Sequence, residues 1–189
     1  MKNVLQLLIF ALLFSSCADE QRATKKTTLP PISEVYESYY EGSLALNPVY
    51  GNFYGVNRYF DTLPNNLTDE YRAKEVAHYQ THLDKIQKYN RTELNESDQL
   101  NYDILVWYAT NKLGYDHNFT KYLPIDQLKS INLYVAQLAS GSSIQPFATV
   151  TDYENWITRL EDYNVWLDTA LMNMKEGITL GYVQPEAIV

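Results

Sequence analysis

The feature that most constrains the fold is a long amphipathic segment near the end of the chain. Between residues 151 and 181, apolar side chains recur at steps of three and four, which is the spacing of one helix face. They are Trp156, Leu160, Tyr163, Leu167, Ala170, Met174 and Ile178. Thr151 and Glu154 have the spacing of an N-terminal capping box, and Gly181 is a typical helix stop. Such a helix has to pack its apolar face against other elements.

Four further segments carry helical periodicity and supply those partners. They are residues 33–46, 69–89, 95–114 and 125–140. In the third of them, Leu100, Ile104 and Trp107 form the expected core stripe, with Leu105 and Ala109 beside it. No segment shows the alternating pattern of a strand. The sequence therefore predicts an all-α fold, with about five helices in an irregular helical bundle that is the N-terminal portion of a larger helical fold.

Residues 47–66 break this periodicity with two glycines, two prolines and many aromatic rings, and they are expected to form an ordered loop. A cluster of tyrosines begins before the loop and extends into it. Its members are Tyr36, Tyr39, Tyr40, Tyr50, Tyr54 and Tyr59. Tyrosine suits helix interfaces and binding surfaces equally, so two interpretations stay open. In the first, the cluster packs a core; in the second, it lines a groove that binds a peptide or protein partner.

The N-terminal end has the pattern of a secretory signal. Lys2 precedes an apolar run at residues 4–14, which is too short to span a bilayer but fits a signal peptide. The small residues before Cys17, the one cysteine of the chain, resemble a bacterial lipobox. Residues 1–16 are therefore expected to be a signal peptide and Cys17 the lipidation site. The alternative is an ordinary secreted protein in which Cys17 is incidental.

This interpretation also predicts location and domain organisation. Residues 17–28 are polar and are expected to be a disordered tether, and residues 29–189 a helical domain. The domain is expected in the cell envelope, outside the cytoplasm, and attached to a bacterial membrane through the lipid. The 23 Asp and Glu residues outnumber 15 Lys and Arg. This balance argues against a nucleic-acid partner and against a basic membrane-binding surface.

The three histidines are weak candidates for chemistry. His78 and His82 stand four residues apart, a spacing that places two imidazoles on one metal ion. The zincin pattern requires glutamate directly after the first histidine, and Tyr79 occupies that position. The pair is therefore expected to lie on a solvated helix face. His117, beside Asp116, is interpreted as a charge partner at the exit of the preceding helix.

Paired acids are the remaining candidates. Glu37 and Glu41 have the spacing of one helix face, and two carboxyl groups can perform acid–base catalysis. Such pairs are common by chance in an acidic chain. The sequence therefore assigns no catalytic residue, no metal ligand and no cofactor-binding residue; Cys17 is its one predicted site.

Several stretches together resemble the family known as domain of unknown function 885. The first is the passage with Pro48, Gly51, Gly55, Arg58 and Asp61. The others are DQLNYDIL at 98–105, PFATVTDYENWITRL at 146–160 and MKEGITLGYVQPEAIV at 174–189. The resemblance covers residues 29–189. It implies a lipoprotein or secreted protein of bacteria, in a family whose members are commonly longer.

In members of that family, the later part of the sequence carries a zinc-type motif in which a His-Glu pair is followed by a second histidine. The resemblance therefore implies zinc-dependent peptidase activity, with a peptide substrate, for full-length relatives. None of those ligands matches a position of this sequence, so this chain is expected to be catalytically inactive and to hold no cofactor. The chain is expected to stop as a further helix starts near Pro185. Trp156, Leu167 and Met174 are expected to be exposed for that reason.

Overall fold

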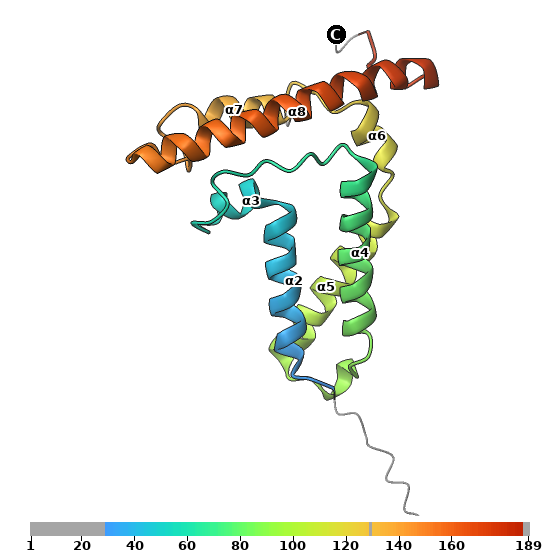
Figure 1. Cartoon of the computed structure of the whole chain (residues 1–189). Helices are drawn as coiled ribbons and strands as arrows, with labels where there is room; N and C mark the ends of the chain where they lie inside the picture. The colour runs from blue at the N-terminus through green and yellow to red at the C-terminus, as the bar shows by residue number, and fades with distance from the viewer. Residues whose placement is uncertain (1–28, 129, 187–189) are drawn as a thin grey trace, which may run out of the picture.

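A computed structural model describes residues 29–128 and 130–186, and every regular element within them is helical. The predicted all-α fold is therefore confirmed for this part of the chain (Figure 1). The elements are α2 (Ile32–Leu46), α3 (Pro48–Phe53), α4 (Asp69–Ile86), the 3-10 helix η2 (Arg91–Glu93), α5 (Glu96–Gly114), α6 (His117–Tyr122), α7 (Ile131–Leu138) and α8 (Val150–Leu180). None of these helices combines the length and apolar character that crossing a membrane requires. The predicted signal peptide and Cys17 lie outside the described residues.

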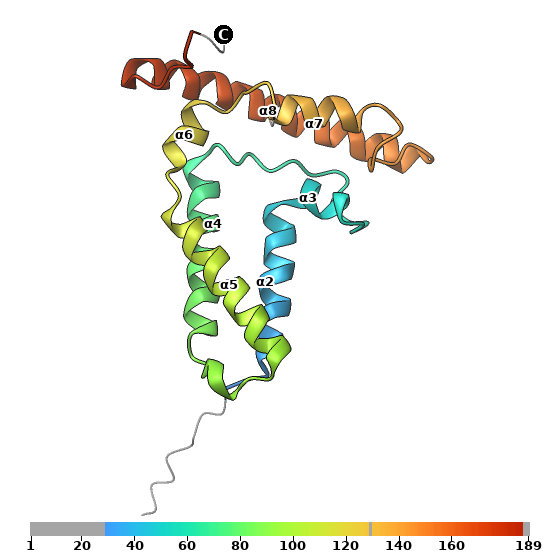
Figure 2. The same ribbon diagram turned by 180° about the vertical axis from the view of Figure 1, so that it is seen from behind.

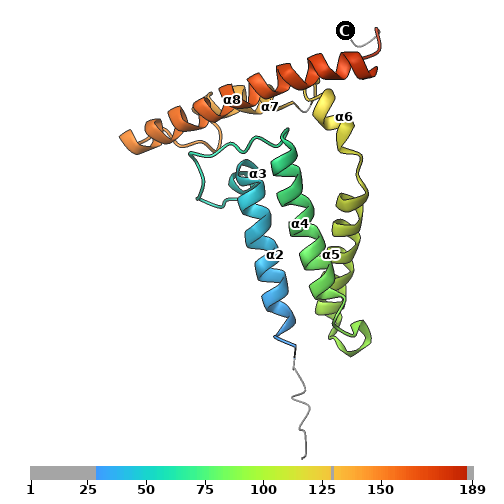
Figure 3. The same ribbon diagram turned by 45° about the vertical axis from the view of Figure 1, so that its right-hand side comes forward.

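The helices α2, α4 and α5 form a three-helix bundle with α4 as its middle member (Figure 3). Both outer helices pack against α4. The core of the bundle is apolar and draws on all three helices. Its buried members are Val35, Tyr79, Ile86, Leu105 and Ala109. Burial of such side chains is the main force that holds this bundle together.

The long helix α8 lies across one end of the three-helix bundle, with α7 beside it (Figures 1 and 3). The connection from α3 to α4, residues 54–68, runs along α8, and α6 packs against α8 as well. Leu67, Trp166 and Ala170 form the small core here. We call α6, α7, α8 and residues 54–68 the α8 layer.

Side-chain caps fix where two helices of the three-helix bundle begin. The Thr68 hydroxyl accepts a hydrogen bond from the Tyr71 N–H at 3.1 Å, which caps the start of α4. The Asn95 side chain accepts one from the Asp98 N–H at 3.0 Å, at the start of α5. Each cap satisfies a backbone donor that has no partner within the helix.

The capping box of α8 was predicted two residues too late. Thr149 and Asp152 form it, because Thr149 accepts from the Asp152 N–H at 3.2 Å and Asp152 accepts from the Thr149 N–H at 2.8 Å. Thr151 lies inside the helix instead. The predicted stop is confirmed, since Gly181 adopts the left-handed conformation with φ 85°.

Two helical segments differ from the predicted ranges. Residues 47–66 contain the short helix α3 rather than a loop throughout. The predicted helix at 125–140 is confined to α7, because side chains hold the preceding backbone in a turn. There the Asp126 carboxylate accepts from the Leu128 N–H at 2.6 Å, and the Ser130 hydroxyl donates to the Asp126 carbonyl at 2.6 Å. The short helix α6 was not predicted.

The predicted core stripe of α5 faces outward. Leu100, Ile104 and Trp107 are 61%, 54% and 67% exposed, whereas Leu105 and Ala109 are buried. The small side chain of Ala109 lies in the core shared with α4, so α5 turns its Leu105–Ala109 side inward.

The predicted stripe of α8 lies on the packed side of the helix except at Ile178, but the most buried positions beside it are largely others. The residues buried along this helix are Arg159, Trp166, Ala170, Asn173 and Gly177. Trp156, Leu167 and Met174, which were expected to be exposed, are each half-buried. The exposed apolar side chains of α8 are others, including Val150, Ile157, Val165, Met172 and Ile178.

Candidate functional site

A wedge-shaped groove opens between α2 and α5. Both helices pack on α4, and α5 crosses from the lower end of α2 toward the upper part of α4 (Figure 2). At the narrow end the Tyr36 hydroxyl donates a hydrogen bond to the Asp98 carbonyl at 2.9 Å, which joins the two outer helices. Tyr79 of α4 lies at the floor. The hollow measures about 690 Å³, which is the size of a ligand-binding site.

Tyrosine is the commonest residue of this wall, and we call the hollow the tyrosine groove. Its tyrosines are Tyr36, Tyr39, Tyr40, Tyr50, Tyr54, Tyr79 and Tyr108. Five of them belong to the cluster noted in the sequence, and these five line the hollow. Two of the five, Tyr36 and Tyr39, also pack against the core of the bundle. Binding of a partner by the cluster stays a prediction. Tyr59 does not line the groove. Its carbonyl instead accepts a hydrogen bond from buried Arg159.

The rim of the tyrosine groove is open to solvent. Tyr54 is 77% exposed, Tyr50 62% and Tyr40 49%. The rings of Tyr50 and Tyr54 lie 5.7 Å apart between centroids, so they form one aromatic edge at the wide end. Exposed aromatic rings that gather around a hollow are typical of a surface that binds a partner.

The tyrosine groove is nearly neutral, although the chain is acidic. Among its described lining residues, Lys112 is the charged one, and its ammonium lies 5.6 Å from the centroid of the Tyr108 ring. Burial raises the pKa of Tyr36 and of Tyr39 to about 12. Both hydroxyls therefore stay protonated near neutral pH and can donate hydrogen bonds.

Two histidines lie directly behind the groove wall, not on a solvated face as predicted. His82 is 7% exposed and His78 is half-buried between α2 and α4. The Nε2 atoms of His78 and His82 lie 3.1 Å from the hydroxyls of Ser43 and Ser38, respectively. The His78 ring stacks on Tyr39 with centroids 5.1 Å apart.

The protonation state of these histidines follows from their surroundings. The Nδ1–H of His82 donates to the carbonyl of His78 at 2.8 Å, so the Nε2 of neutral His82 accepts from Ser38. Burial lowers the pKa of His78 to about 4 and also lowers that of His82. Both rings are therefore neutral at pH 7, and they act as packing and hydrogen-bonding groups that support the groove wall.

The other predicted candidates are placed elsewhere. His117 begins α6 rather than ending α5, and its Nδ1 lies 4.0 Å from the Glu75 carboxylate. Glu41 forms an ion pair with Arg58 at 2.9 Å, and Glu37 is exposed, so the structure does not bring these two acids together as a reactive pair. Within the described residues, no group of three or more His, Cys, Asp or Glu side chains is arranged to hold a metal ion.

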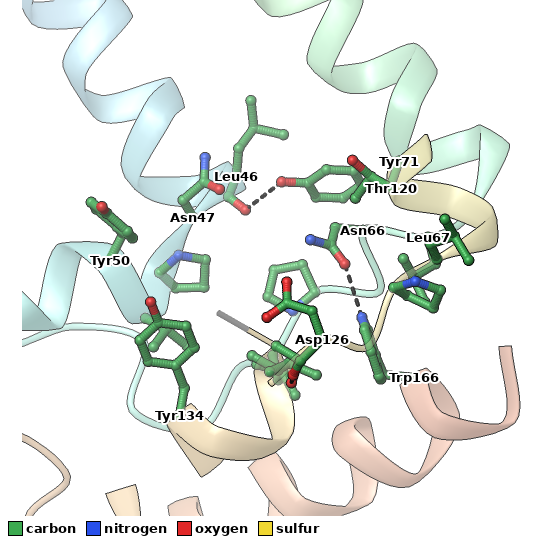
Figure 4. A pocket seen from close by; sticks show the side chains of 18 of the residues that line it. Leu46, Asn47, Tyr50, Asn66, Leu67, Tyr71, Thr120, Asp126, Tyr134 and Trp166 are labelled. Atoms are coloured by element: carbon green, nitrogen blue, oxygen red, sulfur yellow. Dashed lines mark hydrogen bonds between the residues drawn. The ribbon is translucent and has the colours of Figure 1, made fainter. Parts of the chain in front are cut away.

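The structure also contains a second hollow that could not be found from the sequence, because its walls come from many separate elements, including the end of α2 and the connection from α3 to α4. It measures about 390 Å³ and lies between α3, α4, α6, α7 and α8 (Figure 4). Asn47 and Tyr50 line both this hollow and the tyrosine groove. The two hollows therefore adjoin at the start of α3.

Comparison with known proteins gives one match. A family model described as "Bacterial protein of unknown function (DUF885)" matches residues 48–189. This range covers most of the chain, including both hollows except for their lining residues before Pro48. No curated protein and no solved structure matches the chain.

Proposed function

Because this chain belongs to the DUF885 family of bacterial proteins of unknown function, we propose that it is the helical, ligand-binding part of an envelope lipoprotein. The tyrosine groove is the binding site, and its ligand is an extended, uncharged peptide segment. The observation that carries this proposal is the gathering of seven tyrosines around one open hollow, six from four helices and Tyr54 from the residue after α3.

The chemistry of the groove favours a peptide. Aromatic-lined grooves recognise extended and proline-rich segments, because the rings pack against the side chains and the hydroxyls bond to the backbone carbonyls. The hydroxyl of Tyr39 stays protonated, which suits it to such a contact. The Tyr36 hydroxyl already donates to the Asp98 carbonyl, so Tyr36 offers its ring and an acceptor oxygen. Lys112 is the charged lining residue, so a strongly charged ligand finds little electrostatic complementarity there.

The role proposed for this chain is binding alone. The family resemblance implies zinc-dependent peptidase activity for full-length relatives, and a groove that holds a peptide segment is consistent with such an enzyme. No described residue is assigned a catalytic role, and zinc chemistry is proposed only for those relatives.

Cys17 supports the envelope part of the proposal. Its lipidation would attach the domain to a bacterial membrane, with the groove outside the cytoplasm. Mass spectrometry of the mature N-terminus tests this. We expect an N-terminal Cys17 that carries acyl chains, and an unmodified Cys17, or cleavage at another residue, would contradict the anchor.

Peptide binding is tested with a library of dodecapeptides and a pair of matched variants. In the first, Tyr40→Ala and Tyr54→Ala are combined, which removes two rim rings without touching the core. The control is Tyr153→Ala on α8, which removes a tyrosine of similar exposure far from the groove. We expect the double variant to bind a selected peptide about tenfold to hundredfold more weakly, since each lost aromatic contact contributes about 0.5–1.5 kcal/mol. Equal binding by all three proteins would contradict the site.

A further inference from the structure

The second hollow has the character of a pocket for one compact apolar group. Its walls are mostly apolar side chains, and they come from six helices and the connection from α3 to α4. Leu63, Leu67 and Trp166 are 4%, 3% and 3% exposed, and all three face this hollow. A wall made of such buried residues is largely preformed, so a ligand meets little cost of ordering it.

Hydrogen bonds fix the polar edge of the hollow. The Trp166 indole N–H donates to the Asn66 Oδ1 atom at 2.8 Å, and the Tyr71 hydroxyl donates to the Leu46 carbonyl at 2.8 Å (Figure 4). These bonds hold an indole ring and a phenol ring in set positions. Because Oδ1 of Asn66 is occupied, its Nδ2 is the atom that remains to donate to a ligand carbonyl.

The size of the hollow matches an aromatic or large aliphatic side chain. An engineered protein cavity of about 150 Å³ holds a benzene molecule. The present hollow, at about 390 Å³, has room for a phenyl or indole group together with the backbone atoms next to it. Among the described lining residues, Asp126 is the charged one, so an anionic side chain is disfavoured.

The position of the hollow links it to the proposed peptide site. Asn47 and Tyr50 stand between the two hollows and line both. The two hollows therefore adjoin, close enough for neighbouring parts of one peptide to occupy both.

We propose that this hollow, hereafter the side-chain pocket, binds one large uncharged apolar side chain of the peptide held in the tyrosine groove. Asn66 donates a hydrogen bond from Nδ2 to a neighbouring carbonyl of that peptide. This inference rests on the proposed function and adds its specificity: the groove takes the extended segment, and the pocket selects phenylalanine, tryptophan or leucine at one position.

The probes are N-acetyl-L-phenylalaninamide and N-acetyl-L-alaninamide, observed by saturation-transfer NMR with the full chain. They are short enough to report on the pocket without a peptide in the groove. We expect the phenylalanine probe to bind roughly tenfold or more tightly than the alanine probe, because the pocket buries a phenyl ring in one case and a methyl group in the other.

Val49→Phe, which places a ring inside the pocket from α3, should abolish that difference. Val165→Phe is the matched control on the exposed side of α8 and should leave it unchanged. A second variant, Asn66→Asp, keeps the acceptor that Trp166 uses and removes the donor. It should weaken both amide probes about threefold while circular dichroism shows an intact fold.

Equal binding of the two probes, or a preference that survives Val49→Phe in a folded protein, would overturn the side-chain pocket. The same experiments distinguish a failure of the side-chain pocket from a failure of the tyrosine groove. Loss of peptide binding in the Tyr40→Ala and Tyr54→Ala protein with no preference for phenylalanine would sustain the proposed function and reject the pocket. A phenylalanine preference that Val49→Phe abolishes, in a chain that binds no library peptide, would sustain the pocket and reject the groove.

Discussion

The three-helix bundle and the α8 layer bury different kinds of side chain. The core of the bundle is mainly aliphatic and aromatic, although α4 also buries Glu75 and His82. Along α8, by contrast, Arg159 is fully buried and Asn173 is 8% exposed. Arg159 donates to Asn52, Gln145 and the Tyr59 carbonyl, and Asn173 donates to the Leu67 carbonyl at 3.1 Å.

Polar contacts continue along the connection from α3 to α4. Asp162 accepts from the Leu63 N–H at 2.9 Å, and Asn65 donates to the Thr169 hydroxyl at 2.7 Å. The α8 layer thus fixes an irregular backbone by satisfying its polar groups, whereas the bundle relies on apolar burial. In a connection without regular structure, side chains can satisfy the backbone donors and acceptors that its turns leave unpaired. This difference makes the two regions respond to different substitutions.

The largest expected effect is at the buried arginine of the α8 layer. Burial lowers the pKa of Arg159 to about 10, so the side chain is still charged at neutral pH. In Arg159→Met, the buried Asn52 and Gln145 lose their partner, and each unsatisfied group costs about 1–3 kcal/mol. We expect a loss of about 3–4 kcal/mol in the free energy of unfolding, measured by urea denaturation. Thr158→Ala, at the exposed neighbour, should change it by less than about 0.5 kcal/mol. Wild-type stability in Arg159→Met would show that apolar packing alone holds this layer.

The next effect tests the apolar core of the bundle with two adjacent residues of α5. Leu105 is 4% exposed and Ile104 is 54% exposed. Leu105→Ala leaves a cavity between α4 and α5, and we expect a loss of about 3 kcal/mol in the free energy of unfolding. Ile104→Ala should cost less than about 1 kcal/mol. Similar losses in the two variants would mean that the outward face of α5 is covered in solution.

The same pair of residues shows what the sequence could predict. Periodicity identified α2, α4, α5 and α8 as helices, because apolar spacing and caps are local properties. It assigned the wrong face to α5, because Leu100, Ile104 and Trp107 are more conspicuous than Leu105 and Ala109. Which of two neighbouring apolar faces turns inward depends on the partner helix, and no local pattern records that choice.

The residues of the tyrosine groove were predictable only in part, as the fold was. Five tyrosines of the groove could be identified as a cluster because they lie close together in the sequence, on α2 and α3 or just beyond. Tyr79 and Tyr108 could not, since only packing on α4 brings them to the same hollow. The burial of Arg159 and of His82 was also beyond reach, because a charged or imidazole group on a helix is usually solvated.

A smaller effect distinguishes the two regions by the pH dependence of their stability. His78 and His82 face Glu75, Lys85, Tyr39 and the hydroxyls of α2, and they belong to the three-helix bundle. The pKa of His78 in the folded chain is about 4, below the ordinary 6.5. Between these two pH values, the unfolded chain therefore binds more protons than the folded chain does.

Stability contributed by neutral His78 is therefore complete above about pH 6.5, falls as the pH falls, and levels off below about pH 4. Since the ring is only half-buried, solvent screening limits the loss to about 1–2 kcal/mol. Chemical denaturation at pH 7 and at pH 4.5 measures it, and His78→Gln should flatten this part of the profile. An unchanged profile in His78→Gln would assign the acid sensitivity to other groups.

The smallest expected effect is at a close contact inside the α8 layer. A Cβ atom at Gly177 would lie 2.8 Å from the Tyr122 Cβ and 3.3 Å from the Tyr122 carbonyl, where α6 meets α8. Overpacking of this kind costs about 1–3 kcal/mol, because backbone on both sides has to shift. Alanine also favours the helix by about 1 kcal/mol relative to glycine, so the net loss for Gly177→Ala should be about 1 kcal/mol.

Gly114→Ala is the matched control at the end of α5, since nothing lies within 4 Å of its added Cβ. Thermal melting should show a lower Tm for Gly177→Ala and an equal or slightly higher Tm for Gly114→Ala; a stabilised Gly177→Ala would mean that α6 and α8 are not in close contact in solution.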